Sequence, residues 1–295
     1  MLSIVLGTYN RLDQLQKCVE SIIHETSASY KIYITDAGST DGTIEYLGSI
    51  ASDTIIPIFV GKKIGQAKAY NDVFAIVNTP YVCWLSDDNV VVNNGLDVAL
   101  SILKSESEIG MVALKTKDMQ GPFVDAPYIG GISEAGILNV NQGMLPTHVL
   151  KQVGGFSEEF RDYGIDPALT AEVLFAGYKI VYTKIIALHH YRNWSEDPNS
   201  ENYQWLQERH KLAKELYASK YSNSAQNATS NNKLKKHAIR NLVKILSKAF
   251  KAPDIRSSEF YRDLFNALSG AYISNFDAIK NKNKQYHLVQ RRTKA

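Results

Sequence analysis

The sequence predicts an α/β fold in which a mostly parallel central sheet is flanked by helices and followed by a basic helical extension. Up to about residue 90, strand patterns alternate with helical patterns of about 10 to 15 residues, which is typical of βαβ units. Three of these strand patterns end in polar clusters. A change in net charge indicates the basic extension. Residues 1–210 hold 15 Lys and Arg against 25 Asp and Glu, whereas residues 211–295 hold 18 against 5.

The elements of the first part follow one another in a regular order. Strands are expected at residues 2–7, 30–39, 54–61 and 81–89, and helices at residues 11–26, 40–50 and 64–78. The first helix illustrates the reason, because Leu12, Leu15, Val19 and Ile22 recur at helical spacing. This order predicts a parallel sheet whose strands all end at one edge.

The second part is less regular. Residues 121–139 are rich in Gly and Pro and are expected to form loops, and residues 146–156 a short helix. Another helix is expected to begin at Asp166, because Pro167 suits the first helical turn. Residues 202–220 show a further helical pattern, and residues 222–232 form a polar hinge. We therefore expect one domain over residues 1–220 and a basic helical extension over residues 221–295.

Polar clusters follow three of the predicted strands, at residues 8–11, 36–39 and 86–89. Ligands of parallel α/β sheets bind beyond the carboxyl ends of the strands, where these clusters converge. The adjacent carboxylates of Asp87 and Asp88 follow a strand of buried character, and they need a metal ion, a helix N-terminus or water to compensate their charge. The sequence therefore predicts a ligand-binding site at this edge.

Several motifs, taken in order, resemble those of glycosyltransferase family 2 with the GT-A fold, over residues 2–192. They are "IVLGTYNR" at residues 4–11, "ITDAGSTDGT" at 34–43, "GKKIGQAKAYN" at 61–71, "LSDDN" at 85–89 and the segment at 153–182. The resemblance implies a nucleotide-sugar donor. It assigns donor binding to seven residues: Thr8, Tyr9, Arg11, Asp36, Gly65, Lys68 and Asp87. For Asp36 and Lys68 the alternatives are a turn-forming carboxylate and a solvated lysine.

The resemblance also implies a divalent cation, Mn²⁺ or Mg²⁺. "LSDDN" departs from the family's D-x-D motif, because Ser86 stands where the first Asp is usual. Asp88 is then the expected metal ligand, helped by a histidine. His190 fits the family's spacing better than His189, and adjacent histidines on a strand point to opposite faces.

Asp166 is the expected catalytic base, because it stands where the family has the Asp of a Glu-Asp pair, although Ile165 replaces the Glu. The alternative for Asp166 is a helix N-cap. Asp125 and Glu134 lie in the loop that is expected to border the acceptor. The implied reaction is an inverting, metal-assisted transfer from a nucleotide sugar to a glycan or lipid-linked acceptor. We expect the donor to be UDP-linked.

Two other functions stay open at this point. A non-catalytic relative that binds nucleotide sugars or glycans would tolerate the departures at Ser86 and Ile165. A nucleotidyltransferase would share the α/β nucleotide site, but "LGTYNRLDQL" lacks the Gly-rich loop with Arg and Lys expected after its first strand.

The basic extension contains an amphipathic pattern at residues 233–250, with a basic stripe at Lys236, Arg240, Lys244 and Lys248. Such a helix suits an anionic membrane surface, although it can also pack on its own domain; nucleic acid is not expected, because no aromatic residues interleave with the basic ones. The chain has two cysteines in apolar settings, no run of the ~20 apolar residues that a membrane span needs and no signal-peptide pattern. We expect a cytoplasmic protein at the inner face of the membrane.

Overall fold

The computed structural model describes residues 1–132, 138–193, 195, 197–217, 219 and 220, together with residues 237, 238, 241, 245, 289 and 290. Glu134 and nearly all of the basic extension lie outside the described residues.

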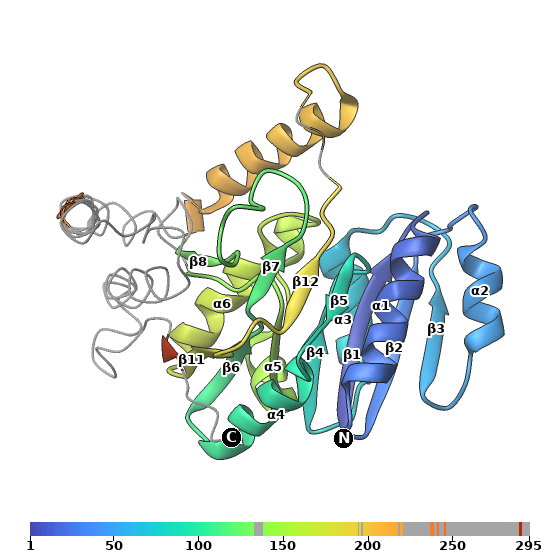
Figure 1. Cartoon of the computed structure of the whole chain (residues 1–295), viewed down its shortest axis with the longest axis horizontal. Coiled ribbons are helices and arrows are strands. Elements are labelled where there is room, and N and C mark those ends of the chain that lie inside the picture. The colour runs from blue at the N-terminus through green and yellow to red at the C-terminus, as the bar shows by residue number, and fades with distance from the viewer. Residues whose placement is uncertain are drawn as a thin grey trace.

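The described chain is built around an eight-stranded, mostly parallel sheet, as predicted (Figure 1). Its strand order is β13-β11-β6-β10-β4-β1-β2-β3, and β10 alone runs antiparallel to its neighbours β4 and β6. The strands are β1 (Leu2–Thr8), β2 (Tyr30–Asp36), β3 (Ile55–Phe59), β4 (Tyr81–Trp84), β6 (Ile109–Ala113), β10 (Gly143–Pro146), β11 (Lys179–Tyr182) and β13 (Val289–Gln290). The parallel order β4-β1-β2-β3 brings the carboxyl ends of these strands to one edge.

Helices cover both faces of the sheet. They are α1 (Leu12–Glu25), α2 (Thr43–Ile50), α3 (Gln66–Ile76), α4 (Gly95–Ser105), α5 (Thr147–Val153), the 3₁₀ turn η1 (Glu158–Phe160) and α6 (Ile165–Phe175), and residues 201–217 are also helical. The face covered by α1, α2 and α4 buries Ile4 and Leu6 of β1, whereas the face covered by α3, α5 and α6 buries Val5. This alternation follows from the two-residue period of a strand and gives the domain two cores.

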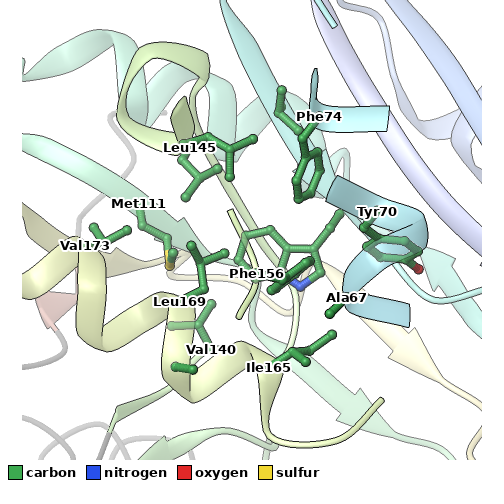
Figure 2. Packing of buried hydrophobic residues seen from close by; sticks show 14 of the residues in the cluster. Ala67, Tyr70, Phe74, Met111, Val140, Leu145, Phe156, Ile165, Leu169 and Val173 are labelled. Carbon is green, nitrogen blue, oxygen red and sulfur yellow. The ribbon is translucent and has the colours of Figure 1, made fainter. Parts of the chain in front are cut away.

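The core under α3 and α6 is aromatic. Figure 2 shows Tyr70 and Phe74 of α3 packed with Phe156, and Leu169 of α6 with Met111 of β6. Trp84 of β4 belongs to the same cluster and packs edge-on against Phe156, with ring centroids 5.6 Å apart. This core therefore joins the ends of β4 and α6.

A second sheet of three strands, in the order β5-β12-β7, lies beside the carboxyl end of β4 (Figure 1). Its strands are β5 (Asn89–Val91), β7 (Thr116–Asp118) and β12 (Leu188–His190), and the short strands β8 (Gly131–Ile132) and β9 (Leu138–Asn139) form a separate pair. The prediction of one strand over residues 81–89 was wrong at its end. The backbone N–H of Ser86 donates to Asn89 Oδ1 at 3.0 Å, and this bond closes a turn over residues 85–88.

Candidate active site

Three of the predicted residues meet where β1 and β4 end. Arg11, at the start of α1, donates from Nη1 to Asp87 Oδ1 at 3.0 Å and to Asp88 Oδ2 at 3.2 Å. Both carboxylates are nearly buried. Burial raises the pKa of Asp87 to about 6 against the pull of Arg11, and the charge of Asp88 adds to the shift. Arg11 therefore supplies part of the positive charge that the two carboxylates need.

His190 lies on the other side of Asp88. Its Nε2 is 3.2 Å from Asp88 Oδ1, and its Nδ1 is 2.9 Å from Asp118 Oδ1, because the register of the second sheet sets His190 opposite Asp118. Arg192 in turn donates from Nε to Asp118 Oδ2 at 3.2 Å. Burial opposes the protonation of His190, but Asp118 and Asp88 outweigh it and raise the pKa of the imidazole.

These contacts set the charge of Asp88 and the choice between the two histidines. Burial opposes the ionisation of Asp88, but His190, Arg11 and Arg192 hold the pKa of its carboxyl below the usual value. His189 is only partly buried, and burial and the nearby Lys117 lower the pKa of its imidazole. The structure thus places His190, and not His189, against Asp88.

The donor atoms at Asp88 and His190 suit a hard divalent cation. Asp88 Oδ1 is buried, and no hydrogen bond of good geometry reaches it. When the neutral imidazole donates its Nδ1–H to Asp118, the lone pair of Nε2 faces this oxygen, and two lone pairs then converge. No group of three or more His, Cys, Asp or Glu suited to a metal occurs within the part of the chain that the structure describes. The remaining ligands would have to come from donor phosphates and water.

Asp166 lies in the first turn of α6, but it does not cap that helix. Gly164, with φ of 82°, occupies the N-cap position, and no side-chain hydrogen bond caps the helix. The carboxylate of Asp166 instead accepts a hydrogen bond from Trp84 Nε1 at 3.2 Å. Burial raises the pKa of Asp166 to about 8, although the Trp84 bond opposes the shift. The N-cap alternative therefore does not describe this side chain, and its pKa suits proton exchange near neutral pH.

We expect this raised pKa to appear in the pH dependence of stability. The pKa of a folded-state carboxyl above the unfolded value of about 3.9 gives stability that is lost as pH rises toward about 8. Between pH 6 and pH 9, the free energy of unfolding of the wild type should fall by about 2 to 3 kcal/mol more than that of Asp166→Asn. Urea denaturation at both pH values measures this difference. An equal change in the free energy of unfolding of the two proteins would contradict the raised pKa of Asp166.

Asp36 and Thr8 are the buried residues of the predicted donor site on β1 and β2. The carboxylate of Asp36 accepts hydrogen bonds from the backbone N–H of Gly38 at 2.8 Å and of Ser39 at 3.1 Å, which is the geometry of a turn-forming aspartate. Tyr9 is 38% exposed, and the Lys63 ammonium lies 3.7 Å from its ring centroid. The role of Asp36 toward a base thus stays a prediction.

The start of α3 is less open than the resemblance implies. Gly65 has φ of 97°, and a Cβ there would lie 2.8 Å from Arg161 Cγ, so its small size admits Arg161. Asp162 Oδ1 accepts the N–H of Gln66 at 2.9 Å. A diphosphate at this terminus would have to displace the Asp162 carboxylate. Lys68 forms a surface pair with Asp72 at 2.7 Å, and its role toward phosphate also stays a prediction.

The predicted acceptor loop lies next to the second sheet. Asp125 is exposed, and the loop around it is held by Lys117, whose Nζ donates to the carbonyl oxygens of Val124 at 2.6 Å and Ala126 at 2.7 Å. Two hollows of about 500 Å³ and about 420 Å³ lie elsewhere, one near Tyr30 and one between η1 and residues 209–219. Neither is lined by Asp87, Asp88 or Asp166, so we place the site at the sheet edge on the grounds of its chemistry.

The chain is similar in sequence to known glycosyltransferases. Residues 3–126 match the family model described as Glycosyl transferase family 2. An uncharacterized glycosyltransferase from Nostoc sp. is 29% identical over 38% of this chain and 35% of that protein. The UDP-Glc:alpha-D-GlcNAc-diphosphoundecaprenol beta-1,3-glucosyltransferase WfaP from Escherichia coli is 28% identical over 36% of this chain and 42% of that protein. The chain thus matches less than half the length of these curated relatives.

Solved structures resemble the fold over most of the chain. The mannosyltransferase PcManGT from Pyrobaculum calidifontis, in complex with GDP-Man and Mn²⁺, has a TM-score of 0.53 at 16% identity and covers 93% of this chain and 85% of its own. Residues 1–349 of S. aureus TarS, in complex with UDP-GlcNAc, give 0.53 at 13% identity, with coverage of 96% and 89%. At these identities the likeness shows the GT-A fold alone. The match over residues 3–126, which is less than half of the chain, shows that this part is similar to glycosyl transferase family 2.

Proposed function

We propose that the protein is a glycosyltransferase that moves a sugar from a nucleotide-sugar donor, UDP-linked by preference, to a glycan or lipid-linked acceptor with inversion. One observation carries this proposal: β4 leads into the buried Asp87–Asp88 pair and, through Trp84, also contacts the half-buried carboxyl of Asp166. A cation-compensated acidic pair and a carboxyl of raised pKa therefore share one strand, as donor binding and proton removal require.

In this mechanism, Asp166 removes the proton from an acceptor hydroxyl as the oxygen attacks the anomeric carbon from the face opposite the leaving group. A single displacement of this kind inverts the anomeric centre. Asp166 must be ionised to act, and a pKa of about 8 makes it a stronger base than an ordinary carboxylate. The rate should therefore rise with pH up to about 8.

The donor side rests on Asp88 and His190, the residues that would hold a divalent ion, and on Arg11. The ion, Mn²⁺ or Mg²⁺, would neutralise negative charge on the diphosphate leaving group. Arg11 pairs with both Asp87 and Asp88 in this structure. With an ion held at Asp88, the Arg11 guanidinium could bind a phosphate oxygen instead. Asp87 would then be left to contact the ribose or the sugar.

A panel of nucleotide sugars tests the proposal. The full chain is incubated with UDP-, GDP- and dTDP-linked sugars and Mn²⁺, and release of nucleoside diphosphate and the melting temperature are measured. We expect one donor class to raise the melting temperature and to be turned over. Turnover of none, with no shift in melting temperature, would contradict the proposal.

A non-catalytic binder of nucleotide sugars is the second candidate, and Ser86 favours it. Its hydroxyl accepts a hydrogen bond from Gln142 Nε2 at 3.1 Å instead of contributing a carboxylate. A binder would show the shift in melting temperature without turnover, so the same panel separates the two functions.

We further propose that the basic extension holds the protein at the inner face of the membrane. None of the helices within the described ranges is long and apolar enough to cross a bilayer. Deletion of residues 233–295 should reduce co-sedimentation with phosphatidylglycerol vesicles at low salt at least tenfold, because each basic residue near an anionic surface contributes about 1 kcal/mol and about 1.4 kcal/mol is a factor of ten. Phosphatidylcholine vesicles are the control, and equal partitioning of the two proteins would exclude this role of the extension.

A further inference from the structure

The indole of Trp84 lies between the two halves of the proposed site. Trp84 is the last residue of β4 and is 1% exposed. Its Nε1–H is shared between the backbone oxygen of Asn141 at 3.1 Å and Asp166 Oδ1 at 3.2 Å. Among the described residues, no other side chain donates a hydrogen bond to the Asp166 carboxylate.

The surroundings hold this ring in one orientation. β4 pairs with β1 on one side and with β10 on the other, so the backbone of Trp84 is fixed. A Cβ on Gly143 would lie 2.5 Å from Trp84 Cη2, which shows how closely β10 approaches the ring. Phe156 packs against it at an interplanar angle of 89°. Figure 2 shows Ala67 and Ile165 in the same cluster. The indole N–H is therefore held rigidly. A catalytic side chain is well placed only when the groups that bind it are themselves fixed by packing.

We propose that Trp84 is a positioning residue for Asp166: its N–H fixes one carboxylate oxygen and favours the ionised form, which leaves the other oxygen for the acceptor hydroxyl. This inference rests on the proposed role of Asp166 as the base. A hydrogen bond to a charged group is stronger than one to a neutral group, so it stabilises the ionised carboxylate selectively. Because Asp87 and Asp88 follow Trp84 on the same segment, one strand end would align the base with the donor site.

Few other groups compete for this effect. Tyr70 of α3 is the titratable neighbour that is influenced by both Asp87 and Asp166, and burial raises the pKa of its phenol, so it stays neutral. The Tyr70 hydroxyl donates to the backbone oxygen of Leu85 at 2.7 Å. Arg11 and His190 contact Asp87 and Asp88 rather than Asp166. The indole N–H is thus the contact to remove.

The test removes the N–H while keeping the ring. Trp84 is replaced by β-(3-benzothienyl)alanine, in which sulfur takes the place of the indole N–H, and in parallel by Phe. The carboxyl of Asp166 is titrated by ¹³C NMR with labelled Asp, assigned through Asp166→Asn, and kcat and KM are followed against pH. We expect the carboxyl titration and the acidic limb of kcat to move up together by about one pH unit. At pH 7, kcat should fall about tenfold while the KM for the donor changes less than twofold.

Trp205→Phe is the matched control, because Trp205 is 45% exposed and packs under Arg209. The benzothienyl variant can instead lower the melting temperature without moving the Asp166 titration or the acidic limb of the kcat–pH profile. In that case Trp84 is only structural, and the inference is overturned. The benzothienyl variant decides the question if the Phe variant does not fold. Failure of the proposed function gives a different result. Asp166→Asn would then keep full transfer, and the ¹³C titration of the wild-type and benzothienyl proteins would still show whether Trp84 shifts the pKa of Asp166.

Discussion

Replacement of Asp166 by Asn is expected to lower kcat by about 10²- to 10⁴-fold, the usual contribution of a general base. The amide has nearly the shape of the carboxylate and can still accept the Trp84 N–H through its oxygen, so the fold and the neighbouring contacts should persist. It cannot take a proton from the acceptor hydroxyl. The KM for the donor should change little, because Arg11 pairs with Asp87 and Asp88 and not with Asp166.

Steady-state transfer to the acceptor, measured from pH 6 to pH 9, checks this expectation. The residual activity of the variant should also lose the rise toward pH 8 that the wild type shows, since the titrating group is gone. Asp53→Asn is the control for a simple change of charge, because Asp53 is exposed and lies outside the proposed site. Full transfer by Asp166→Asn, with an unchanged pH profile, would show that another group is the base.

Much of the fold could be predicted because it depends on short-range patterns. The helices α1 and α3 and the strands β1, β2 and β3 were expected from periodicity, and they occur within a few residues of the expected bounds. The helix α4 was not predicted. Its N-cap Asn94 has φ of 50°, and Gly95 lies so close to Ala187 that a Cβ would be 2.5 Å from the Ala187 Cβ. This contact joins segments far apart in the chain, but the helix itself carries a local signal, because Leu96, Leu100 and Leu103 recur at helical spacing.

The candidate site shows the same division. Its carboxylates, Arg11 and His190 could be singled out because motifs mark them, but their partners could not. Arg11 was expected beside phosphate, which stays a prediction, and its pairing with Asp87 and Asp88 was not foreseen. Asp118 belongs to no motif, and it reaches His190 and Arg192 only because β7 and β12 pair in a fixed register. Motifs in the sequence identify the charged residues of a site, whereas long-range strand pairing determines which of them are in contact.

Asp88→Asn is expected to abolish the response to Mn²⁺ and to lower kcat/KM for the donor by about 10²- to 10³-fold, since a Lewis acid contributes several kcal/mol and 1.4 kcal/mol is a factor of ten. The variant loses the charge of the buried carboxylate whose Oδ1 lacks a good hydrogen bond and faces His190. Calorimetric titration with UDP, with and without Mn²⁺, measures the effect directly. Mn²⁺ should tighten UDP binding to the wild type and not to the variant, because binding of the two is reciprocally linked.

Asp87→Asn is the informative comparison, because Asp87 contacts Arg11 but has no recorded contact with His190. This variant should weaken UDP binding in the presence and absence of Mn²⁺ alike and should keep the enhancement by the ion. If Asp88→Asn keeps that enhancement while Asp87→Asn loses it, the ion binds at Asp87 and His190 has no direct part in holding it. If neither the wild type nor the variants respond to Mn²⁺, the site works without the ion, and Arg11, which already compensates the two carboxylates, is the cation left to meet the diphosphate.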